Sequence, residues 1–154
     1  MGQENVDDTH LMLEDEPAAR AKLVADRKHV LGLSEEQMAD AFPTLLSPVD
    51  AAAITPELSR YLAGSMRDGL APGGDGWWDD GCAQIKPWGF DLESIQVPVQ
   101  LWHGRHDRFV PFQHGEWLAS RIPGVEAHLT TEDGHISLLQ NRVGQMHAWL
   151  LEHF

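Results

Sequence analysis

The chain has 154 residues, which is about the length of one domain with a single hydrophobic core. Its 11 lysines and arginines against 24 aspartates and glutamates give a net charge of −13, which would repel a phosphate backbone, so nucleic acid is not an expected partner. No apolar run is long enough to span a membrane, and "MGQENVDDTH" lacks the regions of a signal peptide. With Cys82 as the single cysteine, no internal disulfide can form, and we expect a cytoplasmic protein that does not enter a membrane.

The first half of the chain has the pattern of short helices. The clearest one has Pro17 at its start, carries apolar residues at helical spacing and stops at Gly32. The sequence "SEEQ", which starts at Ser34, matches a capping box and predicts another helix that ends near Pro43. Two further hydroxyl caps are each followed by a proline, at Ser47 and Thr55. We therefore expect about three or four short helices within residues 5–70.

A loop is expected at 71–81, "APGGDGWWDDG", because its glycines and acidic residues disfavour regular structure. This stretch also carries two of four tryptophans that could line a pocket for an apolar substrate. The four are Trp77, Trp78, Trp88 and Trp102. Since such aromatic side chains more often belong to the core, we favour that interpretation.

The second half alternates strand and helix, as parallel strands joined by a crossover do. A first strand is expected at 97–103, "VPVQLWH", and a second at 124–131, "GVEAHLTT", whose alternation of apolar and polar residues suits an edge strand. Between them a helix is expected to start near Pro111. Three of its residues can face inward: Trp117, Leu118 and Ile122.

A long amphipathic helix is expected to close the chain. The sequence "SLLQNRVGQMHAWLLEHF" places four apolar residues on one helical stripe. They are Leu139, Val143, Met146 and Leu150. The chain is therefore expected to have an α/β fold, in which a helical N-terminal region precedes a β-α-β-α unit with two parallel strands.

A carboxylate and an imidazole follow the two predicted strands. Asp107 comes just after Gly104 breaks the first strand, and His135 lies in the loop "EDGHISLL" after the second. Because a right-handed crossover brings both loops to one edge of the sheet, Asp107 can reach the imidazole, fix its tautomer and stabilise the imidazolium. The alternatives are a turn aspartate and an exposed loop histidine. We favour an acid–base pair of the hydrolase kind.

This arrangement resembles the alpha/beta-hydrolase family. The resemblance is closest over about residues 76–154, through "PWGFDLESIQVPVQLWHGRHDRFVP", "HGEWLA" and "GHISLL", and the order of strand, acid, helix, strand and loop histidine recurs in that family. It implies that residues 76–154 are the C-terminal part of a hydrolase core and that residues 1–75 are a cap-like helical region. It also implies that Asp107 is the triad acid, that His135 is the triad base, and that the substrate is a small ester or similar acyl compound.

One part of the family's pattern is missing from the sequence. Such enzymes carry a nucleophilic serine on a Gly-x-Ser-x-Gly elbow upstream of the acid, and no such elbow occurs here. Ser65 and Cys82 are the alternative nucleophiles, but no apolar strand precedes either of them. We therefore expect the chain to be inactive alone, as one portion of a hydrolase. The alternative is a non-catalytic binding or assembly module derived from a hydrolase.

The sequence indicates no cofactor and no metal. His103, His106 and His114 with Asp107 could bind zinc, yet their spacing matches no standard site, and solvated histidines are the preferred interpretation.

The predicted strand at 97–103 indicates a partner. In the family this strand resembles an interior one with a neighbour on each side, whereas only one other strand is expected here. An open apolar edge invites pairing with another chain. We therefore expect a homo-oligomer, or a partner chain that supplies the missing strands.

Overall fold

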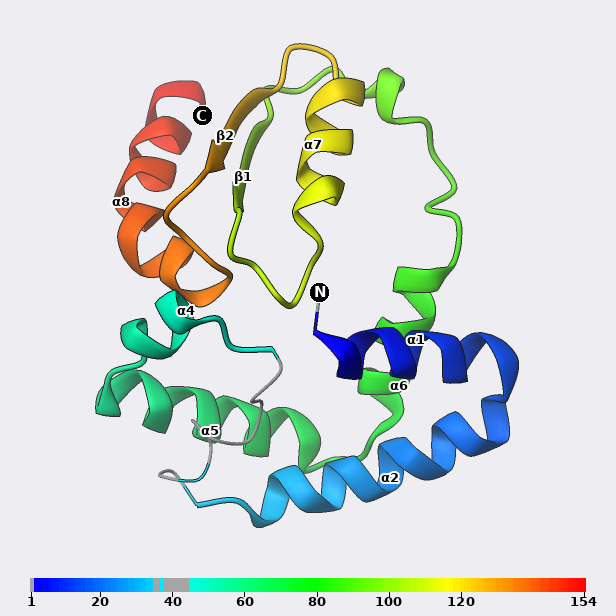
Figure 1. Cartoon of the computed structure of the whole chain (residues 1–154). Coiled ribbons are helices and arrows are strands. Elements are labelled where there is room, and N and C mark those ends of the chain that lie inside the picture. The colour runs from blue at the N-terminus through cyan, green and yellow to red at the C-terminus, as the bar shows by residue number, and fades with distance from the viewer. Residues whose placement is uncertain (1, 35–36, 38–44) are drawn as a thin grey trace. The chain divides into compact units, whose positions relative to one another are not determined.

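The computed structural model describes residues 2–34, 37 and 45–154, which form two compact units (Figure 1). The C-terminal unit comprises Leu45–Ala53 and Gly89–Phe154. The helical unit comprises the described residues of Gly2–Thr44 together with Ile54–Trp88. The C-terminal unit thus includes a segment from the first half of the chain. The expected boundary between residues 75 and 76 stays a prediction.

The C-terminal unit is built around a two-stranded parallel sheet. Its elements are α4 (Pro48–Ala53), η1 (Leu92–Ser94), β1 (Gln100–Gly104), α7 (Phe112–Arg121), β2 (Glu126–Thr130) and α8 (Ile136–His153). In the register of the sheet, Gln100 lies opposite Glu126 and Gly104 lies opposite Thr130. The predicted α/β fold with two parallel strands in a β-α-β-α order is therefore confirmed.

Strand β1 is shorter than the expected strand at 97–103. It begins at Gln100, and the ladder opens with the N–H of Glu126, which donates to the carbonyl of Val99 at 2.9 Å. Val97 is 62% exposed. Pro98 has no N–H to donate, which disfavours extension of the ladder in this direction.

Helices α7 and α8 lie on either side of the two strands (Figure 1). Since side chains alternate along a strand, neighbouring residues of β1 point to opposite faces of the sheet. His103 is buried, and its ring meets the edge of the Phe112 ring of α7. On the opposite face Trp102 stacks on His128, with ring centroids 4.0 Å apart.

Several apolar residues of these helices are exposed. The expectation that Trp117 faces inward is wrong, since it is 48% exposed. Helix α8 forms as predicted, but its buried residues, Ser137 and Leu138, lie in its first turn. Three residues of its predicted apolar stripe are at least 40% exposed: Leu139, Val143 and Leu150. An apolar stripe of α8 therefore faces solvent in the described structure.

The helical unit contains α1 (Gln3–Glu14), α2 (Glu16–Gly32), α5 (Pro56–Leu70) and α6 (Asp75–Ile85). Val30 of α2 and Ala63 of α5 are the buried centre of one hydrophobic cluster. The predicted helix from Pro17 to Gly32 is confirmed as α2, and Thr55 caps α5 by accepting the N–H of Leu58.

The predicted capping box after α2 is present. Gln37 Oε1 accepts the N–H of Ser34, and the Ser34 hydroxyl accepts the N–H of Gln37. The remainder of the helix expected to end near Pro43 lies outside the described residues.

The prediction of a loop at 71–81 is wrong over most of its length, because α6 begins at Asp75. Trp78 of α6 is buried, and the guanidinium of Arg20 in α2 lies 4.0 Å from its ring centroid. This packing outweighs the low helix propensity of the glycines. Of the four tryptophans assigned to the core, Trp78 belongs there, whereas Trp77 and Trp88 are 41% and 54% exposed.

Candidate active site

Asp107 is held in the turn that follows β1. Its N–H donates to the Gly104 carbonyl at 3.1 Å. Its carboxylate oxygen Oδ1 accepts the N–H groups of Phe109 at 2.7 Å and Val110 at 2.8 Å. The side chain is only 6% exposed. Two backbone donors on one oxygen fix the carboxylate plane and leave Oδ2 for another partner.

That partner is His135, whose Nδ1 lies 2.9 Å from Asp107 Oδ2. Because an ionised carboxylate can only accept, Nδ1 carries a proton and donates it, and Nε2 has a free lone pair when the imidazole is neutral. The Phe109 ring stacks on the imidazole, with centroids 4.6 Å apart, yet the His135 side chain remains 44% exposed. The imidazole is thus held at Nδ1, and its other nitrogen is able to take up a proton.

The contact moves the pKa values of both groups. The hydrogen bond to Asp107 raises the pKa of His135 against the opposing effect of burial, and the charges of Asp107 and Asp50 add to the rise. Burial by itself raises the pKa of Asp107, but hydrogen bonds from His135, Val110 and Phe109 outweigh it and hold that pKa below its ordinary value. The arrangement therefore favours an ionised aspartate beside a protonated imidazole.

A short stretch of this chain is similar to a known protein. A pimeloyl-[acyl-carrier protein] methyl ester esterase of Aromatoleum aromaticum is 35% identical over 54 residues, which are 35% of this chain and 22% of that protein. The similarity supports a hydrolase-like origin. The match thus spans less than a quarter of the esterase's length. No family model and no solved structure matches the chain.

A second imidazole, that of His103, lies behind the Asp107 carboxylate. Its Nε2 is 3.6 Å from Asp107 Oδ2 and 3.3 Å from the carbonyl oxygen of Val110. The longer distance exceeds that of an ordinary hydrogen bond. His106 and His114, the other histidines considered as zinc ligands, are exposed. Within the described residues no group of three or more His, Cys, Asp or Glu side chains could hold a metal ion.

Asp50 of α4 is a residue of this site that the sequence did not reveal. Its carboxylate is fully buried and accepts the N–H groups of His135, Ile136 and Ser137, at 3.1, 2.9 and 2.9 Å. "SPVD" predicted only a cap within α4, and that local contact is present between Ser47 and Asp50. No local pattern signals the additional contacts with a loop 85 residues away in the chain.

The pKa of Asp50 reflects these contacts. Burial by itself would raise it, but hydrogen bonds from Ser137, Ser47 and His135 outweigh burial and hold the pKa below its ordinary value. The group is therefore an ionised carboxylate at the start of α8, where the positive end of the helix dipole also favours a negative charge.

Two glycines allow this close packing. A Cβ atom on Gly134 would clash with the Asp50 carboxylate, and a Cβ atom on Gly104 would clash with the carbonyl of Asp133. Asp133 itself is fully buried and accepts from Asn141 Nδ2 at 2.7 Å and from Arg142 Nε at 2.9 Å. The loop that carries His135 is thus tied both to α4 and to α8.

The alternative nucleophiles lie in the helical unit. Ser65 is inside α5 and Cys82 is inside α6, so neither occupies a turn between a strand and a helix. Ser137 is close to His135 in the chain, but its hydroxyl donates to Asp50 Oδ1 and accepts the N–H of Gly134. This buried hydroxyl is therefore committed to holding the loop.

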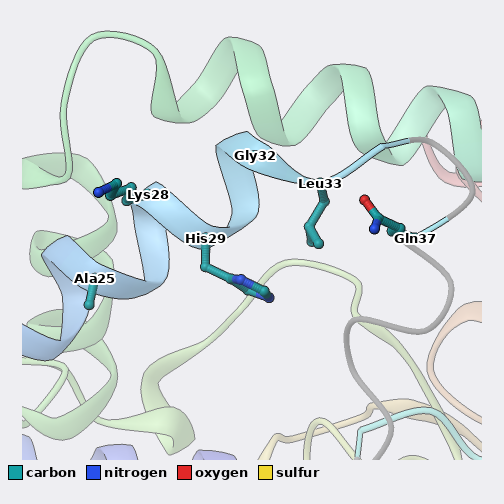
Figure 2. Close-up of a pocket in the computed structure, with 6 residues that line it drawn as sticks. All are labelled: Ala25, Lys28, His29, Gly32, Leu33 and Gln37. Carbon is teal, nitrogen blue, oxygen red and sulfur yellow. The ribbon is translucent and has the colours of Figure 1, made fainter.

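A pocket of about 480 Å³ in the helical unit runs along the end of α2 (Figure 2). Its lining includes Lys28, His29 and Gln37. It does not include Asp107 or His135, so it adds nothing to the chemistry of the pair. Among the helices of the described chain, none has the length and apolar character needed to cross a membrane.

Proposed function

We propose that this chain contributes the acid–base pair of an alpha/beta-hydrolase-type protein that hydrolyses an ester or similar acyl substrate. The observation that carries the proposal is the 2.9 Å contact between Asp107 Oδ2 and His135 Nδ1. The two residues follow neighbouring parallel strands, at the edge of the sheet where open α/β folds keep their chemistry. The local similarity to an esterase supports the same class of reaction.

Each member of the pair has a distinct role in this proposal. Asp107 holds the imidazole in the tautomer that has its proton on Nδ1. Nε2 of His135 then accepts the proton of a nucleophilic hydroxyl as that hydroxyl attacks the acyl carbon, and later returns it to the leaving group. Asp107 stabilises the imidazolium that forms in between.

The chain alone is proposed to be inactive. Ser65 and Cys82 both lie inside helices, and a nucleophile must come within hydrogen-bond reach of its base. Proton transfer without an acyl-enzyme leaves only residual catalysis. A nucleophile on another stretch of polypeptide is therefore part of the proposal.

Hydrolysis of p-nitrophenyl acetate and butyrate tests both statements. The chain alone should show no turnover above background, whereas a longer polypeptide with a strand and a Gly-x-Ser-x-Gly elbow ahead of residue 1 should turn over. Activity of that longer polypeptide should disappear in the His135→Ala variant. Turnover by the chain alone that is lost in His135→Ala would instead assign the nucleophile to this chain, with Ser65 and Cys82 as the first candidates.

A non-catalytic assembly module is the second candidate function, and the exposed apolar residues of α8 favour it. Leu139 and Leu150 are 57% and 48% exposed, and no strand among the described residues pairs with the outer edge of β1. We propose that a homo-oligomer or a partner chain covers this edge. An inactive longer polypeptide would favour the assembly module over the hydrolase.

A further inference from the structure

The segment Leu45–Ala53 contacts both loops of the candidate pair. Arg108, next to Asp107, donates from Nη1 to the carbonyl of Leu46 at 3.1 Å. Asp50 accepts the N–H of His135. The segment belongs to the same compact unit as the sheet, although Ile54–Trp88, which belongs to the helical unit, lies between the segment and the sheet in the chain. It is therefore placed to set the geometry of the acid loop and of the base loop together.

His135 is the N-cap residue of α8, and its side chain does not cap the helix. The ring is instead bonded to Asp107. The first N–H groups of a helix have no partner within the helix and need an acceptor from elsewhere. A residue whose ring must reach Asp107 cannot supply that acceptor, so the first turn of α8 depends on another side chain.

Asp50 supplies the acceptor. Besides the three N–H groups of residues 135–137, its carboxylate accepts the hydroxyl of Ser137 at 2.9 Å and the hydroxyl of Ser47 at 2.8 Å. Charge-assisted bonds of this kind are stronger than neutral ones. With five donors and no exposed surface, the buried carboxylate has hydrogen-bond partners on both of its oxygens.

We propose that Asp50 is a positioning residue for His135, whose carboxylate holds the backbone from which the imidazole reaches Asp107. The chemical meaning of this role rests on the proposed function, but the positioning itself is measurable on the imidazole without any activity. Two negative charges act on the His135 imidazole: Asp107, from the loop after β1, bonds to the ring, and Asp50, from α4, bonds to the backbone N–H of the same residue.

NMR on the whole chain tests the proposal with the variant Asp50→Asn. Asparagine keeps the size of the side chain, but it removes the charge and places an NH₂ group where an acceptor was. The amide protons of residues 135–137 should exchange faster, and the pKa of His135 should fall by less than it does in Asp107→Asn. If circular dichroism shows that Asp50→Asn does not fold, Ser47→Ala is measured instead. It keeps the carboxylate but frees one side of Oδ2, and it should speed the exchange of the His135 amide.

Asp133→Asn is the matched control. Asp133 is also fully buried and bonds to α8, but through Asn141 and Arg142 rather than through residues 135–137. Because Asp133 also ties this loop to α8, the control should change the pKa of His135 and the amide exchange of residues 135–137 less than Asp50→Asn does.

Two outcomes overturn the proposal. The first is a folded Asp50→Asn variant in which neither the His135 pKa nor the exchange of the amides of residues 135–137 changes. If Asp50→Asn does not fold, unchanged exchange of the His135 amide in Ser47→Ala has the same meaning. The other is equal changes in the Asp133 control, which would make Asp50 a structural residue only. A His135 pKa that does not change in Asp107→Asn is a different result. It would mean that Asp107 and His135 do not interact, and it would contradict the proposed function itself.

Discussion

Asp107 divides its carboxylate between His135 and the backbone of its own turn. Oδ2 lies 2.9 Å from Nδ1 of His135, while Oδ1 accepts two N–H groups of the turn. The backbone of the turn therefore sets the direction in which the carboxylate faces the imidazole. Because the Asp107 side chain is already ordered, its contact with His135 costs little additional conformational entropy. A substitution at Asp107 that keeps Oδ1 tests the contact with His135 separately from the turn.

Asp107→Asn should lower the pKa of His135. Asparagine keeps an oxygen for the N–H groups of Phe109 and Val110, but it removes the charged acceptor that raises the pKa of the imidazole. NMR titration of the His135 ring in both proteins measures the difference. An unchanged midpoint would mean that the two side chains do not interact in solution.

The stability difference between the wild type and Asp107→Asn should be largest between about pH 4 and pH 6.5. The folded pKa of Asp107 is lowered from 3.8, so its contribution is present above that value and is lost as pH falls through the folded pKa. The folded pKa of His135 is raised from 6.5, so its contribution is present below 6.5 and is lost as pH rises through the folded pKa. Urea unfolding at a series of pH values measures the difference. A difference that grows above neutral pH would contradict the ion pair.

Gly134→Ala should destabilise the protein by about 1–3 kcal/mol, because the added methyl group would clash with the Asp50 carboxylate. Gly144→Ala is the matched control, since Gly144 lies within α8 and a Cβ there meets nothing within 4 Å. The control should be neutral or gain up to about 1 kcal/mol from helix propensity. Urea unfolding of both variants compares them, and equal effects would argue against tight packing of α4 on the loop.

The chain should be found as an oligomer or with a partner chain rather than as a folded monomer. Sedimentation equilibrium at micromolar concentration should give a multiple of 17.2 kDa if the partner is a second copy. Val143→Lys places a charge on the exposed stripe of α8 and should weaken association, whereas Val24→Lys in α2 should not. A well-folded 17.2 kDa monomer with cooperative melting would contradict both forms of the prediction.

The elements that were predicted well are those with strong local signals. Pro17 and Gly32 bound α2 because proline suits a first turn and glycine an end. The residues around Asp107 and His135 were placed after two parallel strands because alternation and a crossover leave few other topologies. The prediction of a loop at 71–81 is wrong because helix α6 depends on the burial of Trp78 against Arg20, which is a tertiary contact.

The sequence by itself determined which carboxylate and which imidazole come to the same sheet edge, since that follows from strand order and loop position alone. Only the tertiary structure decided how His135 is held. Its backbone N–H donates to the carboxylate of Asp50, 85 residues earlier in the chain, and that carboxylate also accepts the hydroxyl of its local cap residue, Ser47. The tertiary structure likewise decided that the apolar stripe of α8 is exposed, because periodicity shows that a helix has an apolar face but not what covers it. Local patterns encode the elements, whereas contacts between distant segments depend on how those elements pack.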